Sequence, residues 1–77
     1  MNDEHNAVRL EVASRHHAPF RWESMHKGNL SNVDSAVVFL RHSKELLTTE
    51  NVFQIVRVSD GEVLMDDLVL RNEVASK

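Results

Sequence analysis

The chain contains no cysteine, which excludes disulfide bonds, thiolate chemistry and every cysteine-ligated zinc site. A small domain without disulfides must be stabilised by packing or by self-association. A lack of cysteine is typical of proteins in reducing compartments, so we expect a cytoplasmic protein.

Glycine and proline are also scarce, with two and one residues among 77. The loops are therefore expected to be few and short, and a glycine-rich phosphate loop is excluded. No apolar run approaches the roughly 20 residues that cross a bilayer. Residues 1–6 are polar and acidic, which predicts that no signal peptide is present. We expect no membrane partner.

Basic residues are outnumbered, nine against twelve acidic, which gives a net charge of −3. Because affinity for nucleic acid comes mainly from neutralising phosphates, this balance argues against a general nucleic-acid binder. Hydrophobic residues make up 42% and charged residues 27%, as in an ordinary globular protein. We predict a single domain over residues 1–77, with residues 1–6 and 72–77 frayed.

Two segments near the N-terminus show the period-two alternation of half-buried strands. Apolar and charged residues alternate over residues 8–12 and again over residues 20–23. We predict that these strands form an antiparallel hairpin with a loop around residues 14–19. Phe20 and Trp22 are two of only four aromatic residues, and we expect them to pack inside.

A helix is predicted over residues 32–47. Ser31 is a suitable N-cap, and Asp34 stands where a capping box places its acidic residue. The apolar residues that recur at helical spacing are Val33, Ala36, Val37, Phe39, Leu40 and Leu47.

A second hairpin is predicted around Asp60–Gly61, the strongest short signal for a type I′ turn. With these two residues at the tip, Val58 pairs with Val63. After Asp66 and Asp67, residues 68–70 continue the strand or form a separate short one.

These elements define an α+β fold in the order β-β-α-β-β, a four-stranded antiparallel sheet with one helix packed on one face. A single helix leaves the other face uncovered. The strand over residues 52–58 has Val52, Val56 and Val58 on one face, and Phe53 and Ile55 on the other. Self-association would bury the second apolar face.

The stretch from residue 15 to residue 27 combines cationic, histidine and aromatic side chains. The candidate binding residues are Arg15, His16, His17, Arg21, Trp22 and Lys27. They suggest a nucleic-acid patch, because aromatic rings stack on bases, or a metal site that includes Glu23. The spacing matches no zinc pattern, and adjacent residues of an extended chain face opposite ways, so a solvated loop is favoured. We predict no metal and no cofactor.

Two other groups of residues contain the side-chain types that metal binding or catalysis needs. The acidic residues Asp60, Glu62, Asp66 and Asp67 could bind Mg²⁺ or Ca²⁺, but they lack the calcium-loop pattern and are predicted to be solvated. On the predicted helix, neither Ser35 nor Ser43 is spaced to meet His42. The sequence therefore predicts no enzyme.

We predict a non-enzymatic protein-interaction module that self-associates, with a dimer favoured and a further protein partner allowed. The surface would be the helix-free sheet face or a strand edge. The alternatives are a nucleic-acid-binding accessory protein that uses the Arg15–Lys27 stretch, and a histidine-dependent metal-binding protein.

Overall fold

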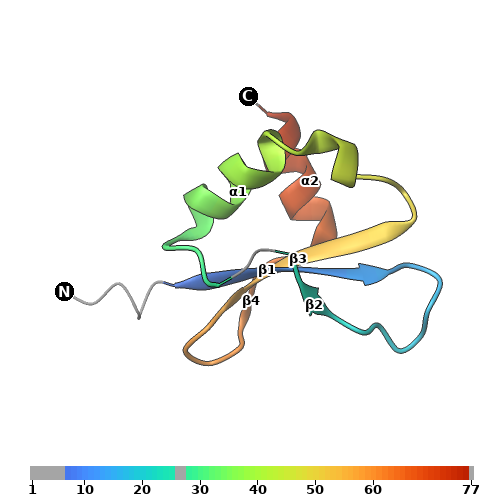
Figure 1. Ribbon diagram of the computed structural model, residues 1–77, viewed down its shortest axis with the longest axis horizontal. Helices are drawn as coiled ribbons and strands as arrows, with labels where there is room; N and C mark the ends of the chain where they lie inside the picture. The colour runs from blue at the N-terminus through green and yellow to red at the C-terminus, as the bar shows by residue number, and fades with distance from the viewer. Residues whose placement is uncertain (1–6, 26–27, 77) are drawn as a thin grey trace.

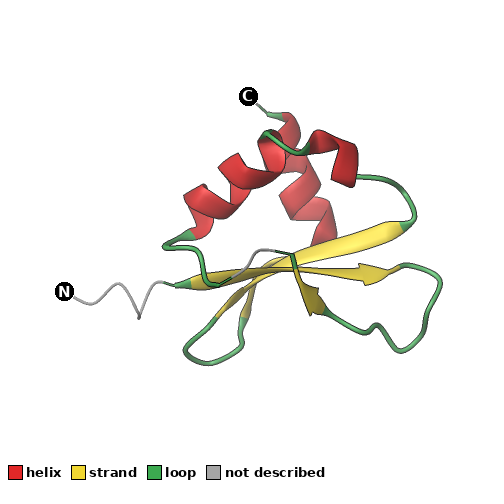
Figure 2. Ribbon diagram, in the orientation of Figure 1, coloured by secondary structure: helices red, strands yellow, loops and turns green. Residues whose placement is uncertain are grey.

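The computed structural model describes residues 7–25 and 28–76. Two helices lie on the same side of a four-stranded antiparallel sheet, so the fold is α+β (Figures 1 and 2). In chain order the elements are β1 (Val8–Ser14), β2 (Glu23–Ser24), α1 (Val33–Arg41), the 3-10 helix η2 (Lys44–Leu46), β3 (Asn51–Arg57), β4 (Val63–Met65) and α2 (Asp67–Ala75). The predicted order β-β-α-β-β is therefore wrong in omitting a second helix.

The strands are arranged in the order β2-β1-β3-β4. The longest pairing joins β1 and β3, from Val8 opposite Arg57 to Ser14 opposite Asn51. The predicted hairpin of β1 with β2 is present, but β2 has only two residues. Beyond β2, an isolated bridge to Leu30 covers the same edge of β1 at Val8.

The helix predicted over residues 32–47 is two elements, because α1 ends at Arg41 and the 3-10 helix η2 follows. Its N-cap is Asn32, not Ser31: the Asn32 Oδ1 atom accepts a hydrogen bond from the Ser35 backbone N–H at 2.9 Å. Asparagine and serine are about equally favourable N-caps, so residue type alone does not show whether Ser31 or Asn32 caps the helix.

The β3–β4 hairpin forms in a register that differs from the predicted one. Val63 pairs with Val56, where Val58 was predicted, and a bulge follows beside Ile55. A type I′ turn needs positive φ at both central residues, but among the described residues only Gly28 and Gly61 have it. Asp60 therefore keeps a negative φ, and the Gly61 N–H closes a longer loop on the Arg57 carbonyl at 2.7 Å.

The segment predicted as a strand over residues 68–70 and a frayed end from residue 72 is the helix α2. Asp66 caps this helix, since its Oδ1 atom accepts from the Val69 N–H at 3.1 Å. Leu70 and Val74 lie one turn apart and are buried. At the far end, the Arg41 guanidinium donates to the Glu73 carbonyl at 2.7 Å and holds the last turn. Residues 1–6 and 77 lie outside the described residues.

The core lies between the helices and one face of the sheet. Its buried members are Val8, Leu10, Ala36, Val37, Leu40, Phe53, Ile55, Leu70 and Val74. Strand alternation puts the remaining buried strand residues on the helix-free face: Glu11, Ala13, Val52 and Val56. The Glu11 carboxylate accepts from Gln54 Nε2 and from Arg9 Nε, both at 2.7 Å. Both faces of the central strands are therefore buried within one chain.

Candidate binding site

The loop between β1 and β2 carries the residues that the sequence singles out. It extends beyond the end of β1 (Figure 1), and residues 14–21 are all exposed. Arg15 serves as an anchor at the base of the loop. Its Nε atom donates to the Thr49 carbonyl at 2.7 Å, and its Nη2 atom donates to the Asn51 carbonyl at 3.1 Å. A carboxylate oxygen of Asp67 lies 3.5 Å away. This arginine therefore fixes the loop to the rest of the fold.

The two neighbouring histidines have different partners. His16 Nε2 lies 2.7 Å from a carboxylate oxygen of Glu50, in a pair that is about 70% exposed on both sides. His17 Nδ1 lies 3.1 Å from the Pro19 carbonyl. A carbonyl oxygen only accepts, so Nδ1 carries the proton. Within residues 7–25 and 28–76, no three His, Asp or Glu side chains are grouped as a metal site would require.

The aromatic residues of the loop pack on each other and not in the core. The rings of Phe20 and Trp22 meet edge to face, with centroids 5.6 Å apart. Phe20 remains 45% exposed, so the prediction that it packs inside is wrong. The reason is the length of β2: the strand begins at Glu23, and both aromatic residues precede it. Lys27 and His26 lie outside the described residues.

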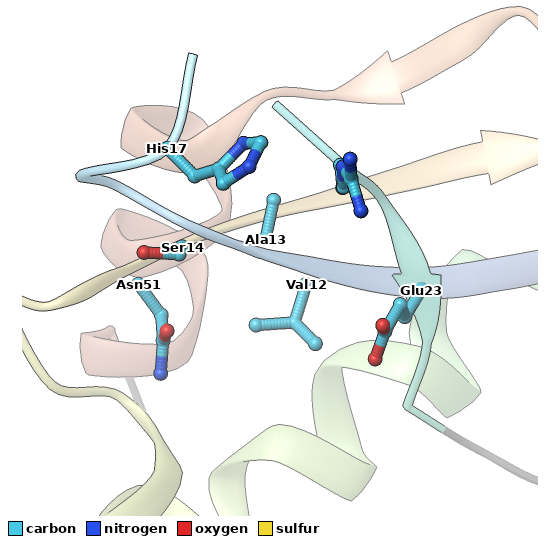
Figure 3. A pocket seen from close by; sticks show the side chains of 7 residues that line it. Val12, Ala13, Ser14, His17, Glu23 and Asn51 are labelled. Atoms are coloured by element: carbon cyan, nitrogen blue, oxygen red, sulfur yellow. The ribbon is translucent and has the colours of Figure 1, made fainter. Parts of the chain in front are cut away.

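A pocket of about 300 Å³ lies where the loop folds back beside β1 (Figure 3). Its lining residues are Val12, Ala13, Ser14, His17, Arg21, Glu23 and Asn51. The His17 ring and the Glu23 carboxylate lie well apart in this view. Of the predicted site residues that the structure describes, only His17 and Arg21 line the pocket. The prediction missed Ser14 and Asn51, which meet because β1 pairs with β3.

The four acidic side chains of the possible Mg²⁺ or Ca²⁺ site all have partners within the fold. Asp66 caps α2, and Asp67 accepts from the Phe53 backbone N–H at 2.9 Å. Asp60 and Glu62 both contact the Arg57 guanidinium at 2.9 Å. The Glu62 backbone N–H also donates to Asp60, and this bond lowers the pKa of that carboxyl group. The hydrogen bond with Asp60 in turn raises the pKa of Arg57.

Comparison of the chain with protein-family models, with curated proteins and with solved structures gave no match. None of the described helices has the length and apolar character that a membrane crossing requires.

Proposed function

We propose that the protein is a non-enzymatic, cytoplasmic interaction module that forms a dimer through the edge of its sheet at β4. The observation that carries the proposal is the position of β4 at the end of the strand order, with no further described strand beside it. Its first residue, Val63, is 47% exposed. A free strand edge offers backbone donors and acceptors that a second strand satisfies.

The opposite edge of the sheet is less suited to this role. There β1 is covered by the two-residue strand β2 and by the bridge to Leu30. The helix-free face is also a weaker candidate than the sequence suggested. Ala13, Val52 and Val56 are already 4–5% exposed within one chain, so a partner would remove little further apolar surface.

Exposed apolar side chains flank β4 on both sides in the sequence. Val58 in the hairpin loop is 38% exposed, and Leu68 and Val69 in the first turn of α2 are 69% and 46% exposed. A second copy fits this edge because two identical β4 strands can pair antiparallel about a twofold axis. The result would be one continuous eight-stranded sheet, with each chain contributing the same residues.

The test is light scattering coupled to size exclusion, with untagged protein over a range of concentrations. Val63→Lys places a charge at the edge, and Val38→Lys is a matched control, because Val38 on α1 is also 47% exposed. We expect a dimer for the natural chain and for Val38→Lys, and a monomer for Val63→Lys. A natural chain that stays monomeric at the highest concentration, or a dimer that survives Val63→Lys, contradicts the proposal.

The loop geometry does not favour the alternative functions. Arg15 and His16 are engaged by Thr49 and Glu50, which leaves Arg21 as the free cation of a nucleic-acid patch among the described residues. Strong nucleic-acid binding needs several phosphate contacts in addition to stacking, and one free arginine supplies few of them. A mobility shift at low salt that weakens steeply with added salt would instead support the nucleic-acid-binding function.

A further inference from the structure

We propose that the pocket between β1 and the β1–β2 loop binds a small zwitterion, a molecule of the size of an amino acid or dipeptide with one carboxylate and one ammonium group. This inference concerns a different surface from the β4 edge and does not depend on dimerisation.

The first observation is the state of Arg21. The chain has six arginines, and five of them donate to an acceptor within the fold. These are Arg9 to Glu11, Arg15 to Thr49, Arg41 to Glu73, Arg57 to Asp60 and Arg71 to Asp67. Among the described residues Arg21 has no acceptor, and it lines the pocket. Its guanidinium group is therefore available to a carboxylate, which it can bind through two parallel hydrogen bonds.

The second observation is the state of Glu23, which lines the same pocket. Its carboxylate has no hydrogen-bond or ion-pair partner among the described residues, although its backbone pairs with β1 opposite Val12. Two opposite charges thus share one pocket without forming an ion pair with each other. A ligand that carries both charges would satisfy both side chains at once, whereas a simple anion would meet repulsion from Glu23.

The remaining wall fits the body of such a ligand. Val12 and Ala13 supply apolar surface, and Ser14 and Asn51 supply polar groups. His17 is held in place because its Nδ1 atom donates to the Pro19 carbonyl. The ring therefore forms a fixed wall. A volume of about 300 Å³ is at the lower end of the range for small-ligand pockets, which suits a molecule of this size.

The test is a titration followed through backbone amide NMR shifts, with leucine and glycyl-leucine as probes. Isocaproate lacks the amine of leucine, and isoamylamine lacks its carboxylate. We expect one of the zwitterions to shift the amides of residues 12–14, 17–18, 20–23 and 51. Each single-charge analogue should bind at least about tenfold more weakly.

Two variants and two matched controls complete the test. Arg21→Gln and Glu23→Gln should each weaken binding of the zwitterion about tenfold or more. Lys44→Gln and Glu45→Gln remove the same charges from exposed positions on η2 and should leave binding unchanged. The proposal is overturned if neither zwitterion shifts these amides, if an analogue binds as tightly, or if the pocket variants bind like the controls. The amide spectrum of each variant shows that it is folded.

Discussion

At the scale of single residues, arginine side chains connect parts of the chain that are distant in sequence. Arg71 lies over the Phe53 ring, 5.1 Å from its centroid, and donates to the carbonyls of Thr48 and Asn51 at 2.8 Å. It also contacts the Asp67 carboxylate at 3.0 Å. These bonds connect α2 to the carbonyl of Thr48, which precedes β3, and to that of Asn51, the first residue of β3.

Asp67 completes the hydrogen bonding of β3, and we predict that Asp67→Ala is destabilising. The ladder with β4 ends at Ile55, so the carboxylate of Asp67 is the acceptor for the N–H of Phe53, whose side chain is fully buried. Leaving that donor unsatisfied should lower the free energy of unfolding by about 2 kcal/mol in urea denaturation.

Two further variants separate the hydrogen bond from the charge. Asp67→Asn keeps an acceptor oxygen and should cost less than Asp67→Ala. Glu45→Ala removes an exposed carboxylate that has no described partner and should change stability by less than about 0.5 kcal/mol. Equal effects of Asp67→Ala and Glu45→Ala would disprove the assigned role.

At this scale, sequence reasoning singled out the stretch that contributes His17 and Arg21 to the pocket, but not the other residues that line it. Alternation correctly placed Glu11 on the opposite face from Leu10, yet it gave no sign that Glu11 is buried. Its burial depends on Gln54, 43 residues away. Asn51 reaches the pocket through the same long-range pairing. Contacts of this kind depend on strand register, which local patterns do not specify.

At the scale of elements, the two central strands were predicted best. The central strands β1 and β3 match the segments predicted from residues 8 and 52 closely. The run Leu68-Val69-Leu70 was misassigned because three apolar residues in a row fit a strand or a helix equally well. A helical signal was present in Asp66, a good N-cap, and in the i, i+4 pair Leu70 and Val74.

The N-cap of α1 provides a direct test at the element scale. Asn32→Ala removes the side-chain oxygen that accepts from the Ser35 N–H and should lower the free energy of unfolding by about 1 kcal/mol. Ser31→Ala should cost clearly less, since the Ser31 hydroxyl contacts only the Ser35 hydroxyl at 3.3 Å among described residues. Chemical denaturation of both variants decides the question, and a larger loss for Ser31→Ala would assign the cap to Ser31.

At the scale of the whole molecule, α2 closes the core over β3. Leu70 and Val74 are 0% and 3% exposed, and they belong to the same cluster as Phe53 and Leu40. For a chain of this length the total stability is roughly 4–11 kcal/mol. The C-terminal segment is therefore a large contributor to the stability of the fold, although the sequence had suggested a frayed tail.

We predict that deletion of residues 72–77 unfolds the protein or leaves it marginally stable. The deletion removes Val74 and the Glu73 carbonyl to which Arg41 donates. Thermal unfolding followed by circular dichroism measures the effect.

A pair of valines on α2 provides point variants for the same question. Val74→Ala should lower the free energy of unfolding by about 2 kcal/mol, because it leaves a cavity in the core. Val69→Ala should change it little, because Val69 is 46% exposed on the same helix. A deletion variant with the thermal midpoint of the full chain would show that the second half of α2 is dispensable.

The pairing of β1 with β3 has a consequence for the time course of folding. Strand β1 is made first, but its main partner begins at Asn51, after α1 and η2. Until β3 and α2 are synthesised, α1 can pack only against β1 and η2, so the first half of the chain leaves the ribosome without a complete core. Closing so long a loop is slow compared with forming the local β3–β4 hairpin. The rate of folding should therefore be set by the meeting of β1 with a hairpin that has already formed.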